Sequence, residues 1–92
     1  MHLDEYEIFL SRELDLCNEF IGKCQRLLER MESRHGMTTE IFLDRWQQGK
    51  LTASREFTKW RDGVEGLRRR SDARNEYQRL LSIMKIWTPN RR

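Results

Sequence analysis

Residues 34–60, RHGMTTEIFLDRWQQGKLTASREFTKW, decide the fold, because they interrupt an otherwise helical sequence at one place. Gly36 follows two basic residues, which is typical of a helix that ends in a left-handed cap with cations in its last turn. Thr38 then suits the N-cap of a short helix over about residues 39–48, which stops at Gly49. Such a helix is too short to be stable alone, so we expect its aromatic residues to dock on longer helices.

The segment before this turn, about residues 4–34, predicts one long helix. Its apolar residues recur every seven positions in two rows that share one face. One row is Leu3, Leu10, Cys17, Cys24 and Met31, and the other is Leu14, Ile21 and Leu28, with Tyr6, Phe20 and Leu27 between them. A stripe this wide is typical of a helix that packs against more than one neighbour, so we expect two chains to share it.

The segment after the turn predicts a second long helix over about residues 55–86, followed by a basic tail at residues 88–92. Its apolar face contains Phe57, Trp60, Val64 and Leu67, and resumes with Tyr77, Leu80, Leu81, Met84 and Trp87. The face positions in between are Ser71 and Arg74, so we expect a polar break in this stripe.

Joined through the turn, the two long helices form an antiparallel hairpin, and residues 1–92 make a single domain. The expected fold is all-α: a long, coiled-coil-like helical hairpin with a short helix at its tip, assembled as a dimer. Counting outward from the tip places Asp15 and Glu19 roughly opposite Arg70 and Arg74. Ion pairs between these side chains would bridge the polar break.

Composition and motifs argue against several classes of protein. No apolar run approaches the roughly 18 residues that cross a membrane. Cys17 and Cys24 lie two helical turns apart, too far for a disulfide, so we expect reduced thiols in a cytoplasmic protein. His2 and His35 stand too far apart in the helix to predict a metal site. Because no nucleophile–base pair or phosphate-binding glycine loop occurs, we expect neither an enzyme nor a cofactor.

Two groups of residues are candidates for binding. An aromatic group forms either the core of the tip or the anchor for a protein partner, and its members are Phe42, Trp46, Phe57 and Trp60. Trp87, at the end of the last helix, is a candidate for a dimer or partner contact. A basic cluster is a candidate for contact with nucleic acid, and its members are Arg68, Arg69, Arg70 and Arg74.

The basic cluster also has a competing explanation within the chain itself. Residues 1–20 carry a net charge of −5, whereas residues 67–92 carry a net charge of +6. In the hairpin these two ends lie side by side, so their charges neutralise each other, and each also complements the dipole of its own helix. This explanation requires no nucleic acid.

The turn segment resembles one found in a family of small prokaryotic helical proteins. These begin with a long coiled-coil-like helix and continue with Y-G-M-[ST]-x-E-x-F-x-x-[KR]-[WF]-x-x-G-x-[LM], then an acidic stretch that leads into F-x-E-W. The matching positions here are Gly36, Met37, Thr38, Glu40, Phe42, Arg45, Trp46, Gly49, Leu51, Phe57 and Trp60. His35 replaces the tyrosine of the pattern, and Thr52-Ala53-Ser54-Arg55 replaces its acidic stretch.

Proteins of this family are regarded as antitoxin-like partners in toxin–antitoxin pairs. The resemblance therefore implies a non-enzymatic protein that binds and neutralises a cognate toxin. One alternative is an accessory protein that binds nucleic acid through the basic face Arg68–Arg74. Another is a structural or inhibitory helical subunit. Affinity for DNA or RNA that falls steeply with salt would favour the nucleic-acid alternative.

Overall fold

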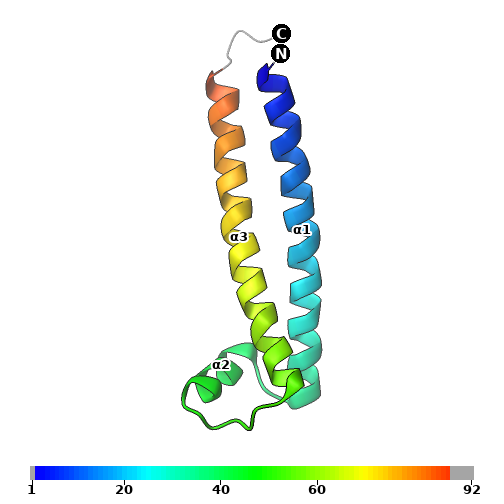
Figure 1. Cartoon of the computed structure of the whole chain (residues 1–92), viewed down its shortest axis with the longest axis vertical. Coiled ribbons are helices and arrows are strands. Elements are labelled where there is room, and N and C mark those ends of the chain that lie inside the picture. Colours follow the sequence, from blue (N-terminus) through cyan, green and yellow to red (C-terminus); the bar gives the residue numbers. More distant parts are fainter. Residues whose placement is uncertain (1, 88–92) are drawn as a thin grey trace.

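The computed structural model describes residues 2–87 of the chain, and the side chains of residues 5–84. Helix α1 spans His2–His35, α2 spans Thr39–Gln47 and α3 spans Arg55–Trp87. As Figure 1 shows, α1 and α3 run side by side in opposite directions and α2 lies across one end of the pair. The predicted all-α hairpin with a short helix at its tip is therefore confirmed. None of the described helices has a segment apolar enough to span a membrane.

The molecule is a rod that measures 58 × 20 × 17 Å. Its radius of gyration is 18.3 Å, whereas a compact domain of 100 residues has a radius of gyration of about 13 Å. Because only two helices run along most of this length, each long helix has one neighbour within the chain. The rest of its circumference faces outward.

Capping residues fix where the helices stop and start at the tip. Gly36 has a φ of +63°, the left-handed conformation that ends α1 as predicted. Thr38 caps α2, because its Oγ1 accepts a hydrogen bond from the Ile41 N–H at 3.2 Å. At the start of α3, the Ser54 Oγ accepts from the Phe57 N–H at 3.0 Å. The two changes of direction are thus encoded by local hydrogen bonds.

A compact core holds α2 against the hairpin. Phe42 and Trp60 are completely buried and stack with ring centroids 4.0 Å apart and planes 3° apart, and Met31 is buried beside them. The Trp60 Nε1–H donates to the Thr39 Oγ1 at 3.1 Å, and the Thr39 N–H donates to the Glu32 carboxylate at 2.8 Å. The short helix is therefore fixed by both aromatic stacking and hydrogen bonds.

Along the shaft of the hairpin, α3 approaches α1 through two glycines. A Cβ on Gly63 would lie 2.8 Å from the Leu27 Cδ2, and one on Gly66 would lie 3.2 Å from the Phe20 Cε1. The buried residues of α1 here are Leu10, Cys17, Ile21 and Cys24. The predicted face of α3 is therefore incomplete, since it counts only large apolar side chains and omits the small residues that let the backbones come together.

The cross-helix ion pairs expected in the shaft do not form. Among the described residues, no ion pair joins Asp15 or Glu19 to Arg70 or Arg74. Instead, the Arg70 guanidinium lies over the Phe20 ring, 4.7 Å from its centroid. Arg70 therefore makes a cation–π contact with Phe20 where the sequence predicted an ion pair with Asp15 or Glu19.

Candidate interaction surfaces

The aromatic candidates divide between core and surface. Phe42 and Trp60 have no exposed area, so the structure assigns them to the core of the tip and leaves them no surface for a partner. Phe57 is partly buried, with its ring centroid 5.5 Å from that of Phe42. Trp46 is also partly buried. The side chain of Trp87 lies outside the described side chains, so its predicted contact stays a prediction.

The outer side of α2 carries the accessible apolar residues of the tip. Ile41 is 44% exposed although it directly precedes the fully buried Phe42. The Trp46 ring packs on Phe42 from one side, and the Arg61 guanidinium lies 5.7 Å from its centroid. Tryptophan and arginine are residue types often found at the centre of protein interfaces, and Ile41 adds an exposed apolar side chain on another side of the same short helix.

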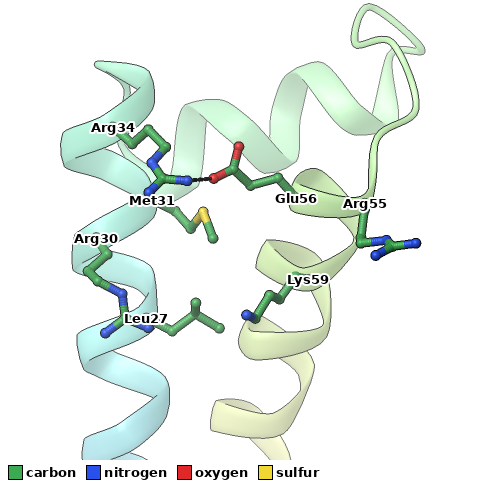
Figure 2. A pocket seen from close by; sticks show the side chains of 7 residues that line it. All are labelled: Leu27, Arg30, Met31, Arg34, Arg55, Glu56 and Lys59. Carbon is green, nitrogen blue, oxygen red and sulfur yellow. Dashed lines mark hydrogen bonds and ion pairs between the residues drawn. The ribbon is translucent and has the colours of Figure 1, made fainter.

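A basic pocket of about 370 Å³ lies beside the tip, between the end of α1 and the start of α3. Figure 2 shows Leu27 and Met31 directed toward the gap between the helices, with Lys59 reaching toward it from α3. The lining residues are Leu27, Arg30, Met31, Arg34, Arg55, Glu56 and Lys59. Four of these seven side chains are cations and one is an anion, so the pocket, which we call the basic tip pocket, favours negatively charged groups.

Glu56, the only acidic residue in the basic tip pocket, is already engaged. Arg34 donates a hydrogen bond to its carboxylate, and this bond, followed by the nearby positive charge, holds the pKa of Glu56 below its ordinary value despite partial burial. The His35 Nε2 lies 3.2 Å from the same carboxylate, close enough for an ion pair but without the alignment of a hydrogen bond. Among the described ion pairs, none includes Arg30 or Lys59, so these two cations remain available to another anion.

A second surface follows one side of α1 for its whole length, and we call it the α1 stripe. Its residues alternate at spacings of three and four: Tyr6, Phe9, Glu13, Leu16, Phe20, Lys23, Leu27, Arg30 and Arg34. Four large apolar members are exposed: Tyr6 by 45%, Phe9 by 50%, Leu16 by 54% and Phe20 by 39%. Apolar surface that gathers on one side of a helix marks a contact with another molecule more often than isolated exposed residues do.

Two shallow hollows adjoin the α1 stripe where α3 passes beside it. One, of about 290 Å³, is lined by Glu13, Leu16, Glu19, Phe20, Lys23 and Arg70. The other, of about 330 Å³, is lined by Phe20, Gly66, Arg69, Arg70 and Ala73. Because the basic tip pocket also includes stripe residues, this side of the molecule is hollowed at several places along α1.

The basic cluster of α3 does not form one face. Arg68, Arg69 and Arg70 follow one another in a helix, so their side chains point about 100° apart. Arg68 pairs with Glu65 and lies near Asp72, while Arg70 contacts Phe20. The expected contact between this cluster and nucleic acid, in which Arg74 also takes part, stays a prediction, and the geometry does not favour it.

The two cysteines sit in the interface between α1 and α3. Cys17 and Cys24 are both buried and both unpaired. Burial raises the pKa of the Cys24 thiol, and the positive charge of Arg70 lowers it by a smaller amount. A buried, protonated thiol is a poor nucleophile. Within the described part of the chain, no group of three or more His, Cys, Asp or Glu side chains is placed to hold a metal ion.

The burial of side chains in the structure shows which side of α1 is covered by α3, which the sequence pattern alone does not show. The two apolar rows predicted in α1 lie on the side that α3 covers, whereas Phe9 and Leu16 of the α1 stripe belong to neither row and are exposed. The alternating three–four spacing of the α1 stripe is the sequence signal that could have identified it. No protein family, curated protein or solved structure matches this chain.

Proposed function

We propose that this chain is a non-enzymatic interaction protein of the antitoxin type, which binds a cognate protein through the outer side of its tip. The observation that supports the proposal is the connection between α1 and α3. Two antiparallel helices need a connection of about 2–8 residues, whereas residues 36–54 here include a complete docked helix. Recognition surfaces are often carried on such connections, held in place by a rigid scaffold.

The chemistry of the tip supports a protein as the binding partner. Ile41 is exposed on α2, while Trp46, on another side of the same helix, packs on Phe42 with the Arg61 guanidinium 5.7 Å from its ring centroid. The aromatic core beneath holds α2 and the Trp46 ring in place, so little backbone entropy is lost when this surface binds. The segment that resembles antitoxin-like proteins, residues 34–60, contributes Ile41 and Trp46 to this surface.

Co-production with the protein encoded by the adjoining reading frame tests this proposal. We expect the two proteins to purify as one complex, and the growth inhibition caused by the neighbouring protein alone to be relieved. The substitution Ile41→Glu should weaken the complex by at least about tenfold, because it places a charge in an apolar contact. Gln47→Glu adds the same side chain at another exposed position on α2 and should leave binding unchanged.

Two results would contradict the proposal. One is that the wild-type protein forms no complex and relieves no inhibition. The other is that Ile41→Glu binds as tightly as Gln47→Glu, which would place the partner elsewhere on the molecule. Circular dichroism of each variant checks that α2 and the hairpin remain folded, since both substitutions are at exposed positions.

A further inference from the structure

The α1 stripe complements itself when α1 is laid antiparallel against a second copy. In such a pair, residues whose numbers add up to 36 lie opposite one another, and the stripe residues from Tyr6 to Arg30 map onto one another. The opposed pairs are Phe9 with the partner's Leu27, Leu16 with the partner's Phe20, Glu13 with the partner's Lys23, and Tyr6 with the partner's Arg30. Apolar residues thus meet apolar residues, an acid meets a base, and a tyrosine meets an arginine that can stack on its ring.

We propose that the α1 stripe is the contact surface of an antiparallel homodimer, with its twofold axis at the level of Asn18, between Leu16 and Phe20. The spacing of three and four gives two lines of positions, each with a seven-residue period, as on the contact face of a coiled coil. The inference is independent of partner binding at the tip, because α2 lies at the end of the rod and the stripe runs along its side (Figure 1).

The pattern selects one register among the neighbouring ones. Sliding one copy by seven residues in one direction puts Glu13 opposite the partner's Leu16. Sliding it by seven residues in the other direction puts Phe20 opposite the partner's Lys23. Each alternative sets a charge against an apolar side chain, which costs free energy when the contact is closed to water.

The same register aligns the two molecules along their whole length. Asn18 lies at the midpoint of α1, which spans His2–His35, so the two hairpins overlap from end to end. The acidic start of one α1 then lies beside the basic tip pocket of the other copy, with the partner's Glu5 at the level of Met31. Arg30 and Lys59 in that pocket have no ion pair among the described residues. Charge complementarity therefore reinforces the apolar contacts.

The exposed area of the single chain is consistent with a missing neighbour. The chain exposes 7106 Å², whereas a compact monomer of its mass, 11.3 kDa, exposes about 5,700 Å². The excess of about 1,400 Å² is larger than the roughly 800 Å² that each partner buries in a stable interface of ordinary size. A second copy on the α1 stripe can cover the four exposed apolar side chains at once.

Charge reversal across the proposed axis tests both the surface and the register. Sedimentation velocity gives the dimerisation constant of the wild-type chain, of Glu13→Lys, of Lys23→Glu, and of the double variant with both changes. Each single variant places like charges opposite each other twice per dimer, so we expect its dimerisation to weaken by about tenfold or more. The double variant restores both pairs and should dimerise like the wild type, as should an equimolar mixture of the two single variants.

A matched control distinguishes an effect of charge reversal on the α1 stripe from an effect of charge reversal anywhere on α1. Asp15→Lys makes the same change as Glu13→Lys two residues away, at an exposed position off the stripe, and should dimerise like the wild type. The inference is overturned if the wild-type chain is monomeric at millimolar concentration, if the single variants dimerise like Asp15→Lys, or if the double variant fails to recover. Binding of the cognate protein to the tip is measured in a separate experiment. The dimer proposal and the proposed function can therefore fail independently of each other.

Discussion

At the scale of single residues, glycine sets the distance between the two long helices. Gly63 and Gly66 have no side chain where the leucine and phenylalanine side chains of α1 press against α3. In a helix, glycine costs about 1 kcal/mol relative to alanine. At these two positions that cost is offset by the close contact it permits. Gly22, on α1, meets only the end of the Arg26 side chain, so no such contact offsets its cost.

Alanine substitution should therefore give different results at two of these glycines. Gly22→Ala is expected to stabilise the protein by about 0.5–1 kcal/mol, because the methyl group has space and the helix gains propensity. Gly63→Ala gains the same propensity, but its methyl group would lie 2.8 Å from the Leu27 Cδ2, and overpacking costs about 1–3 kcal/mol. Urea denaturation should show Gly63→Ala less stable than Gly22→Ala by at least about 1 kcal/mol. Equal stabilisation of both variants would mean that α3 does not approach α1 at Gly63.

At the scale of elements, α2 depends on its docking contacts. A helix of nine residues is not stable in water by itself. Its hold on the hairpin comes from the stacked Phe42 and Trp60 rings and from the hydrogen bonds at Thr39. The aromatic core is thus a support for the proposed recognition surface and is not itself that surface.

Truncating the buried ring should release α2 from the hairpin. Phe42→Ala is expected to cost about 3–5 kcal/mol, the usual range for a fully buried phenylalanine. Hydrogen exchange should then become fast for the amides of α2, while those in the middle of α1 stay protected, because the loss is local. Ile41→Ala, at the exposed neighbouring position, should change stability by less than about 0.5 kcal/mol. Retained protection of α2 in Phe42→Ala would show that the stacking does not hold the helix.

The elements were largely predictable because their signals are local. Gly36 and Thr38 mark a stop and a start by chemistry that acts within one turn, and both do what their residue types predict. The face of α3 was less predictable. In a sequence, a glycine indicates only a weak helix former, and Gly63 and Gly66 become contact residues only because α1 packs against them. The hydrogen bond from Trp60 to Thr39 spans 21 positions and has no local signal. Whether Phe42 serves as core or anchor was likewise decided by tertiary packing.

At the scale of the whole molecule, the shape of the rod and the distribution of its charges both favour antiparallel association of two copies. A rod made of two helices leaves one side of α1 largely open, and this side carries apolar residues together with an acid toward its start, Glu13, and bases toward its end, Lys23, Arg30 and Arg34. Its acidic end and the basic tip pocket lie at opposite ends of the rod. Two copies in antiparallel orientation therefore bring each acidic end to a basic one, whereas two parallel copies would set like charges together.

The antiparallel arrangement predicts the size of the assembly in solution. Because the twofold axis passes the midpoint of α1, the dimer should be about as long as one chain, 58 Å, and only its cross-section should grow. With the two α1 helices packed about 8–10 Å apart and the centres of the rods at most about one rod width, 20 Å, apart, the radius of gyration should rise from 18.3 Å to about 19–21 Å. Two rods joined end to end at their tips would instead exceed about 30 Å. Small-angle X-ray scattering above the dimerisation constant distinguishes these values, and a maximum dimension near twice the length of one chain would rule out side-by-side association. The double variant Glu13→Lys/Lys23→Glu should scatter like the wild type, because it preserves both the register and the overlap.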